Sequence, residues 1–576
     1  SFYKVTEDYN AMNSQDMINT DTFTPSNDYW AETHKVENQV EALENYNVFE
    51  SDLALQEAVS AHGADWAVAN LKEFGALCGS KEVIEWGFLA NENKPQLYTH
   101  DRHGKRIDEV RYHPAYHQLM SLSMEEGLHA SHWQNTPGAH VARAAKSLMM
   151  TQVEAGHGCP ITMTSAAMPT LKRQANLFEE WAPKILHNSY DARNIPHTEK
   201  DSVTIGMAMT EKQGGSDVRL NSTRARPIGH GGPGEAYELI GHKYFVSAPM
   251  CDAFLVLAQT TSGVSCFLVP RWRPDGTKNP LQIQRLKNKM GNISNASSET
   301  ELRGALGWMV GDEGRGVSAI LEMVAMTRFD CMIGSSALMR QSVSQITHHC
   351  QSRFAFGKVL NQQPLMQNVL ADLILESEAS TALSMRLARS LDMSEQYEQE
   401  KHLVRIGTAI GKYWICKRSP GHAYEAMECI GGSGVMEDCI MPRLFRESPI
   451  NTIWEGSGNV QCLDMLRAMQ KSPASLDAFL NEIYLAESKH PLIAENIKKL
   501  QSELSNKHNI EFRSRSIVQQ MALLFQASSL FQYGEPSIAD AFCSARLKNG
   551  NKGWVYGTLP DNIDCNAIIQ RATPVN

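Results

Sequence analysis

The chain has 576 residues, of which 42% are apolar and 20% are charged, and its formal net charge is −10. This length predicts two to four folding units, and the composition is typical of a globular protein that buries large cores. The acidic balance argues against general nucleic-acid binding, which needs a basic surface. The absence of any run of about 18 apolar residues argues against a membrane-spanning helix.

The twelve cysteines are scattered, with no C-x-x-C pair and no cysteine–histidine cluster at the spacing of a zinc site. We therefore predict no metal site, and free thiols in a reducing compartment are the simplest interpretation. The first residues show neither an Arg-rich transit pattern nor an apolar signal core, and the last residues are no peroxisomal signal. We expect a cytoplasmic protein, or a mitochondrial one if a presequence has been removed.

The apolar pattern changes along the chain, and each change predicts a boundary. Residues 1–50 are acidic and rich in Asn and Thr, which is typical of an extended arm. Residues 51–200 have helical spacing, whereas residues 201–312 contain short β-rich runs between Gly, Pro and Ser, which predict a small antiparallel sheet domain. Amphipathic helices return over 313–470, and an additional helical region follows over 471–576. This order predicts an α+β fold in which helical bundles hold a cofactor against a central sheet.

The segment 207–217 reads MAMTEKQGGSD. Its two adjacent glycines let the backbone approach a flat ligand closely, and Thr210 and Ser216 supply hydroxyl groups. The alternative is an ordinary connection from a strand to a turn, in which Ser216 or Asp217 caps a helix. By itself, the segment favours that alternative.

The segment 243–247, KYFVS, has the composition of a strand. Alternation sends Phe245 and Ser247 to one face and Tyr244 and Val246 to the other. An aromatic ring beside a hydroxyl group is suited to cover a flat ring system and to donate a hydrogen bond to it. An ordinary core strand has the same pattern.

Arg353 and Phe356 precede Gly357 at a spacing of one helical turn, which predicts that both project from the same helix face. Arginine pairs with phosphate through charge-assisted hydrogen bonds, and phenylalanine packs on aromatic rings. An arginine in a surface salt bridge is the alternative.

Glu455 stands between Trp454 and Gly456 in the sequence NTIWEGSGN. Burial beside an aromatic ring raises the pKa of a glutamate towards neutrality and makes it a usable proton acceptor. Ordinary loop chemistry explains an isolated Trp-Glu-Gly turn equally well, so the motif gains weight only from the other segments.

Taken in order, these segments resemble the flavin-dependent acyl-CoA dehydrogenase family. RYHPAYH at 111–117, CPITMT at 159–164, MTEKQGGSD at 209–217 and MTRFDC at 326–331 resemble its AidB-like branch in particular. The resemblance covers roughly residues 50–550. It implies a helical N-terminal domain, a central antiparallel β domain and a C-terminal helical bundle, here with an additional helical extension.

The resemblance also implies FAD as the cofactor and Glu455 as the catalytic base. The base removes the α-proton of a fatty acyl-CoA, while the backbone N–H of Glu455 polarises the thioester and the β-hydrogen leaves as hydride to flavin N5. Some branches of the family place the base at the position of Thr327, which cannot serve, and this favours Glu455.

The implied site residues fall into two sets. Those for the cofactor are Met207, Met209, Thr210, Gly215, Ser216, Phe245, Ser247, Arg353, Phe356, Gln363, Glu428, Gly431, Gly432, Ser457 and Asn459. Those for the substrate are Ser216, Arg328, Gly456 and Arg467.

Two departures from the family pattern affect the cofactor set. Phe245 and Ser247 stand where Trp and Thr are usual, which preserves the chemistry with a smaller aromatic contact. Glu428 stands where glutamine is usual, so a carboxylate would lie near the phosphates or ribose of the cofactor.

The resemblance implies a homo-oligomer, commonly a tetramer, because the segments at Arg353 and at Gly431–Gly432 reach the flavin nucleotide of a neighbouring subunit. The implied reaction converts medium- or long-chain acyl-CoA to trans-2-enoyl-CoA, with an electron-transfer flavoprotein or a similar acceptor.

Three alternatives remain open at this point. A flavoprotein that binds or sequesters acyl-CoA and regulates lipid metabolism would suit a cytoplasmic location. An AidB-type DNA-associated flavoprotein is disfavoured, because Lys/Arg and Asp/Glu are nearly balanced over residues 471–576 and counterion release would contribute little. An acyl-CoA oxidase is disfavoured by the motifs and by the missing peroxisomal signal.

Overall fold

The computed structural model describes residues 33–548 and 555–575, and contacts divide the chain after Glu41. In the first unit, residues 33–41 form neither helix nor strand, and residues 1–32 of the predicted arm lie outside the described residues. The predicted arm extends to residue 50, but the side chains of Leu43, Tyr46 and Phe49 are buried in the core of the second unit. Apolar residues in a polar stretch therefore attach residues 42–50 to the first helices.

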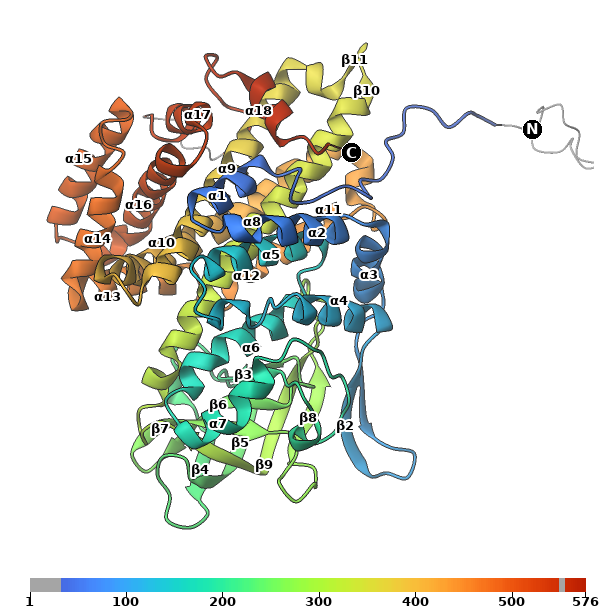
Figure 1. Ribbon diagram of the computed structural model, residues 1–576, viewed down its shortest axis with the longest axis vertical. Coiled ribbons are helices and arrows are strands. Elements are labelled where there is room, and N and C mark those ends of the chain that lie inside the picture. Colours follow the sequence, from blue (N-terminus) through green and yellow to red (C-terminus); the bar gives the residue numbers. More distant parts are fainter. Residues whose placement is uncertain (1–32, 549–554, 576) are drawn as a thin grey trace, which may run out of the picture. The chain divides into compact units, whose positions relative to one another are not determined.

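The second unit begins with a helical region interrupted by one hairpin (Figure 1). Its helices are α1 (Leu53–Ala61), α2 (Val68–Cys78), α3 (Lys81–Glu92), α4 (Pro114–Glu125), α5 (Ala139–Val153), α6 (Gly158–Leu171) and α7 (Ala175–Ile185). The hairpin consists of β1 (Gln96–His100) and β2 (Arg106–Arg111), which the helical spacing did not predict. Pro114 at the first turn of α4 fits its position, because proline there loses no helical hydrogen bond.

The central region is a sheet domain, as predicted, and its strands pair around a closed path. The strands are β3 (Ile205–Ala208), β4 (Arg224–Pro227), β5 (Ala236–Ser247), β6 (Ala253–Thr260), β7 (Gly263–Pro270), β8 (Leu281–Leu286) and β9 (Ser297–Val310). Pairings β6–β4, β4–β5, β5–β9, β9–β7 and β7–β6 return to their start, with β3 added to β6 and β8 to β9. Closure protects the edges of the inner strands.

The prediction of a purely antiparallel sheet is wrong at two pairings. β3 and β4 both run parallel to β6. Two strands can pair in parallel only after a crossover, and here the intervening β4–β5 hairpin brings the chain back to β6 in the direction of β3. The other pairings are antiparallel.

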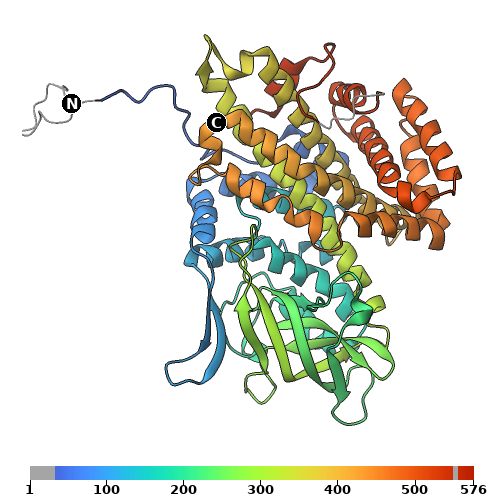
Figure 2. The same cartoon turned by 180° about the vertical axis from the view of Figure 1, so that it is seen from behind.

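The C-terminal part is helical, with three long helices at its centre (Figures 1 and 2). The long helices are α8 (Gly316–Ser352), α9 (Pro364–Met393) and α10 (Glu398–Ile430). A small hairpin of β10 (Phe354–Ala355) and β11 (Lys358–Val359) joins α8 to α9, and the 3₁₀ turn η7 (Gly431–Val435) follows α10. The remaining helices are α11 (Met441–Glu447), α12 (Ile450–Ile453), α13 (Gly458–Lys471), α14 (Pro473–Tyr484), α15 (Pro491–Ser505), α16 (Ile510–Tyr533), α17 (Pro536–Arg546) and α18 (Cys565–Ala572).

Two cores hold these parts. The larger core joins α8, α9 and α10 to the N-terminal helices and to α13–α18, and Leu338, Leu373 and Ile410 lie fully within it. The smaller core joins the sheet to α6 and α7. None of the helices in the described ranges is both long enough and apolar enough to cross a membrane, and the twelve cysteines carry no disulfide.

Candidate active site

Glu455 lies in the tight turn between α12 and α13, in an unusual backbone conformation. Its φ is +59°, in the left-handed region, and that of Gly456 is +100°. A residue with a side chain adopts this conformation at a cost of about 1–3 kcal/mol, which the surrounding contacts must offset. The turn is therefore held in place by its surroundings and not by its own backbone preference.

Three side chains hold the turn by its carbonyl oxygens. Lys412 Nζ, on α10, donates to the carbonyl oxygens of Trp454 at 2.9 Å and of Gly456 at 2.7 Å. Arg328 Nε, on α8, donates to the Glu455 carbonyl at 2.8 Å, and Gln461 Nε2, on α13, donates to the Gly456 carbonyl at 2.9 Å. Because the donors come from three helices, the bundle itself fixes the position of Glu455.

The carboxylate of Glu455 has one hydroxyl partner. Thr327 Oγ1, on α8, donates to Glu455 Oε2 at 2.7 Å. Burial raises the pKa of Glu455, and this effect exceeds the lowering by the Thr327 hydrogen bond and by the positive charges of Arg328 and Lys412. The arrangement is that of a desolvated carboxylate able to accept a proton near neutral pH.

Arg328 and Arg467, both predicted to contact substrate, meet at one aspartate. Arg328 Nη1 lies 3.1 Å from Asp464 Oδ2, and Arg405 makes two further contacts with Asp464 at 3.0 Å. Arg467 Nη1 lies 3.5 Å from Asp464 Oδ1, and its side chain is largely exposed. The cluster ties α8, α10 and α13 together beside Glu455, and the substrate contacts of both arginines stay predictions.

The predicted cofactor loop 207–217 is anchored by a residue that was not assigned a role. Glu211 is fully buried and accepts from Lys243 Nζ at 2.8 Å and from Ser222 N at 2.7 Å. Although burial acts to raise its pKa, the hydrogen bonds from Lys243 and Thr223 hold the pKa of Glu211 well below its usual value. The ion pair between Glu211 and Lys243 fixes the loop to β5, while residues 212–217 at its tip are largely exposed.

The tip of this loop needs glycine at one position. A Cβ on Gly215 would lie 2.6 Å from Thr210 Oγ1, so the close return of the loop onto Thr210 excludes a side chain there. Met207, Met209 and Thr210 are half-buried, and Ser216 is exposed. These residues present hydroxyl groups and thioethers around an open backbone.

The end of β5 carries Phe245 and Ser247 as predicted, with a β-bulge between Lys243 and Val246 that interrupts the alternation. The ring of Phe245 is 44% exposed, whereas Val246 is buried. Ser247 is half-buried, and its Oγ lies 2.9 Å from Ser297 Oγ on β9. The strand thus offers one accessible aromatic ring and one hydroxyl group backed by a second hydroxyl.

The prediction that Arg353 and Phe356 share a helix face is wrong. α8 ends at Ser352, and Phe356 forms the turn of the β10–β11 hairpin with φ +52° and an exposure of 99%. Gly357, at φ +81°, completes a turn that a helix cannot continue. Gln363 Nε2 donates to the Ala355 carbonyl at 2.9 Å and so supports the hairpin from below.

The glycine turn after α10 is open. Gly431 has φ +79°, and no heavy atom lies within 4 Å of a Cβ built on Gly431 or Gly432. Glu428, in the last turn of α10, is exposed. At the start of α13, Ser457 is exposed, and the side-chain oxygen of Asn459 accepts from Arg515 Nε at 2.8 Å. Asn459 is therefore already bound to α16.

A polar cavity of about 40 Å³ lies between α5, α6 and α8. Helix α8 connects it to the Glu455 site, because the same helix carries Thr327. Asp330, one helical turn after Thr327, accepts from Thr162 Oγ1 at 2.8 Å and pairs with buried Arg143. On the far side of the cavity, Ser123, His157 and Glu154 form a buried hydrogen-bonded chain. These polar and charged groups make the cavity an unfavourable site for an alkyl chain.

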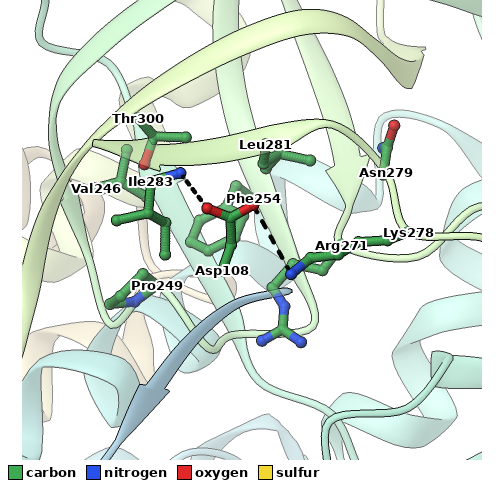
Figure 3. Close-up of a pocket in the computed structure, with 10 residues that line it drawn as sticks. All are labelled: Asp108, Val246, Pro249, Phe254, Arg271, Lys278, Asn279, Leu281, Ile283 and Thr300. Carbon is green, nitrogen blue, oxygen red and sulfur yellow. Dashed lines mark hydrogen bonds and ion pairs between the residues drawn. The ribbon is translucent and has the colours of Figure 1, made fainter. Parts of the chain in front are cut away.

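A second, smaller cavity of about 20 Å³ lies beside β2 (Figure 3). Figure 3 shows Asp108 directed towards the backbone N–H of Ile283, which donates at 3.0 Å, and towards Lys278 at 3.9 Å. This cavity is too small for an organic ligand, and its contacts attach the β1–β2 hairpin to the sheet domain.

The residues of the predicted cofactor set have chemistry that fits a flavin nucleotide, although the structure places them in two separate parts of the chain. Hydroxyl groups of Thr210, Ser216 and Ser247 can bond the polar edge of a flavin ring, and Phe245 offers a ring face for packing. The open glycine turn at 431–432 leaves room for a nucleotide backbone, and Arg353 is suited to phosphate.

The functional residues that the motifs missed are those whose partners lie far away in the sequence. Lys412 and Gln461 hold the Glu455 turn, and Thr327, which stands where other branches of the family place the base, donates to the Glu455 carboxylate. No signal marked Lys412, since a lysine in a long amphipathic helix is ordinarily exposed. Adjacent Gly411 is a weak hint of close packing at that level.

Comparison with known proteins agrees with this geometry. Residues 38–192 match the family described as "Adaptive response protein AidB N-terminal domain". Residues 206–305 match the acyl-CoA dehydrogenase middle domain, and residues 314–470 match the acyl-CoA dehydrogenase C-terminal domain.

Individual relatives cover nearly the whole chain. The AidB protein of Escherichia coli (strain K12) is 44% identical over 95% of this chain and 99% of its own length. Acyl-CoA dehydrogenase family member 11 of Caenorhabditis elegans is 30% identical over 84% of this chain and 79% of its own. The structure of C. elegans ACDH-11 in complex with C11-CoA has a TM-score of 0.82 at 26% identity and covers 91% of this chain and 95% of that chain. The chain therefore belongs to the acyl-CoA dehydrogenase family and to its AidB-like branch, and its α+β fold is that of the family.

Proposed function

We propose that the chain is an FAD-dependent acyl-CoA dehydrogenase that converts a fatty acyl-CoA to its trans-2-enoyl-CoA. Glu455 acts as the base that removes the α-proton, and the β-hydrogen leaves as hydride to flavin N5. The observation that carries the proposal is the half-buried Glu455 turn, whose carboxyl group has a raised pKa and whose backbone is held by side chains from three helices.

The residues of the chain divide the work in this reaction. The Glu455 carboxylate takes the α-proton while Thr327 keeps one of its oxygens in place. The backbone N–H of Glu455 is suited to polarise the thioester carbonyl, because it donates to no acceptor within the described part of the chain. Bound FAD would supply the electron-accepting chemistry, which no protein side chain can provide.

The cofactor residues lie in two separate places on one chain, which supports an oligomer. Figure 1 shows the β10–β11 hairpin and the sheet domain at opposite ends of the compact unit. One FAD cannot contact Ser247 and Phe356 of the same chain, so we propose that the hairpin of one copy completes the FAD site of another. The exposure of Phe356 supports this arrangement, and a tetramer is the proposed assembly.

Medium- or long-chain acyl-CoA is the proposed substrate, and an electron-transfer flavoprotein or a similar protein is the proposed acceptor. The relative ACDH-11, solved in complex with C11-CoA, supports this chain length. The ion pair of Asp330, one helical turn after Thr327 on α8, with Arg143 counts against it, because a charged pair beside the acyl site would be unfavourable for a long alkyl chain. A series of acyl chain lengths decides between the two arguments.

The test is an anaerobic absorbance titration of the protein with acyl-CoAs of graded length. Bleaching of the flavin in the wild-type protein and none in Glu455→Gln, with acyl-CoA binding retained, is the expected result. Glu437→Gln, at an exposed position on the loop before α11, serves as the control and should bleach normally. Bleaching by Glu455→Gln would refute the base. Tight acyl-CoA binding without bleaching in the wild-type protein would replace catalysis by acyl-CoA sequestration as the function.

A further inference from the structure

A chain of polar groups runs from Ser247 on β5 to its cross-strand partner Ser297 on β9 and on to Lys289. Lys289 Nζ lies 2.8 Å from Ser297 Oγ, and Ser297 Oγ lies 2.9 Å from Ser247 Oγ. Lys289 also donates to the carbonyl oxygen of Asn295 at 2.6 Å. Ser297 is buried, so these contacts are shielded from competing water.

The chemistry of the three groups gives the chain a direction. A lysine ammonium donates hydrogen bonds and accepts none, so Ser297 Oγ must accept from Lys289. The hydrogen of Ser297 is then available for Ser247 Oγ, which lies 2.9 Å away. Once Ser247 Oγ accepts, its own hydrogen must point away from Ser297, out of the strand.

We propose that Lys289, acting through Ser297, is a positioning residue that holds the Ser247 hydroxyl as a hydrogen-bond donor towards the flavin. This inference rests on the proposed function in one respect, that FAD lies against the end of β5. It adds two residues to the site, neither of which touches substrate or cofactor. N5 of an oxidised flavin is an acceptor, so a directed donor at Ser247 is complementary to it.

The donor orientation requires a protonated lysine. Burial lowers the pKa of Lys289 to about 8, while the carboxyl groups of Glu447 on α11 and Glu154 in the loop before α6 act to raise it, and the Cys159 thiol on α6 also faces the amine. The ammonium is present below this pH and is lost as pH rises through it. A neutral amine can instead accept from Ser297, which reverses both hydroxyl groups and turns Ser247 into an acceptor.

The experiment follows the visible absorption of bound, oxidised FAD in the substrate-free holoenzyme as a function of pH. In the wild-type protein we expect the flavin band to shift as pH rises through about 8. Lys289→Met should abolish this titration and resemble the wild-type protein at high pH. Ser297→Ala should abolish it as well, although it keeps the lysine charge, which separates the hydroxyl chain from a simple charge effect.

Lys278→Met is the matched control. Lys278 is another partly buried lysine of the sheet domain, with its pKa also lowered to about 8 by burial, but it lies beside Asp108 (Figure 3). This variant should keep the wild-type titration. For Lys289→Met we expect turnover to fall about tenfold while FAD content stays near that of the wild-type protein, as for a loss of about one directed hydrogen bond.

The outcomes separate this inference from the proposed function. A pH titration that persists in Lys289→Met or in Ser297→Ala would overturn the positioning role alone. Normal titration without any bleaching by acyl-CoA would refute the dehydrogenase and leave the positioning role standing. Absence of FAD from the purified wild-type protein would overturn both. If Lys289→Met fails to fold, Ser297→Ala, which removes a single oxygen atom, still tests the positioning role.

Discussion

The two halves of the candidate site are built in opposite ways. The base half consists of Glu455 with Thr327, Arg328, Lys412 and Gln461, and its hydrogen bonds are all made within one chain. The cofactor half consists of the loop tip at 212–217, the end of β5 and the β10–β11 hairpin, which are largely exposed. Under the proposed function, the base half is therefore arranged before any ligand arrives, whereas FAD and a second copy would complete the oxidising half.

The largest effect is expected from Lys412→Met, which attacks the base half alone. It removes the donor to the Trp454 carbonyl and leaves the Gly456 carbonyl with Gln461 alone, and an unpaired polar group costs about 1–3 kcal/mol. A misplaced Glu455 should lower turnover by at least about tenfold, since 1.36 kcal/mol corresponds to a factor of ten. Turnover and FAD content are measured together.

FAD content should stay unchanged in Lys412→Met if the halves are independent. Lys401→Met, at an exposed position on the same helix, is the control and should have wild-type turnover. A loss of FAD from Lys412→Met would show that the base half also organises the cofactor half.

Arg353→Ala attacks the cofactor half. Loss of a charge-assisted contact with phosphate should weaken FAD retention by roughly tenfold or more, because such bonds contribute about 1.5–3 kcal/mol. The FAD-to-protein ratio is measured over a dilution series alongside the molar mass of the assembly. FAD loss that follows dissociation of the assembly would support the shared site, and an unchanged FAD content at every concentration would contradict it.

Thr327→Val sharpens the comparison within the base half. The Thr327 hydrogen bond lowers the pKa of Glu455, so its removal should raise that pKa further. Glu455 must be ionised to accept a proton, and activity is therefore lost as pH falls. The acidic limb of the kcat/KM profile should move to higher pH in Thr327→Val, with little change on the alkaline side. An unmoved acidic limb would mean that another group controls it.

The smallest effect is expected from Glu428→Gln, which introduces the residue usual in the family. Glu428 is exposed, so removal of its charge near a bound phosphate should tighten FAD binding by only about twofold to fivefold, in line with 0.2–1 kcal/mol for surface charges. The gain should shrink as salt screens the interaction. Titration of the apoprotein with FAD at low and high ionic strength measures both.

Local motifs predicted the residues whose role depends on their immediate neighbours in the sequence. Glu455 is flanked by the aromatic and glycine residues that bury it and turn the chain, and the loop at 209–217 carries its glycines and hydroxyl groups together. The long helices α8, α9 and α10 followed from their apolar spacing. The sheet domain followed from short β-rich runs between turn residues.

What the sequence did not predict depends on contacts between distant segments. Lys412 lies 44 residues before Gly456, and Thr327 lies 128 residues before Glu455. The spacing of Arg353 and Phe356 fits a helix, but the chain must turn at Gly357 to enter α9, and a hairpin results. The β1–β2 hairpin is half-exposed and rich in charges, so neither strand has a distinctive apolar pattern.

The left-handed backbone of Glu455 sets stability against activity at a single residue. Glycine adopts this conformation without penalty, so Glu455→Gly would relieve backbone strain and also remove a carboxylate whose burial is costly. Selection for thermal resistance alone would favour that replacement and would yield a sturdier, inactive protein. Under the proposed mechanism, the glutamate at this turn therefore trades backbone stability for proton abstraction.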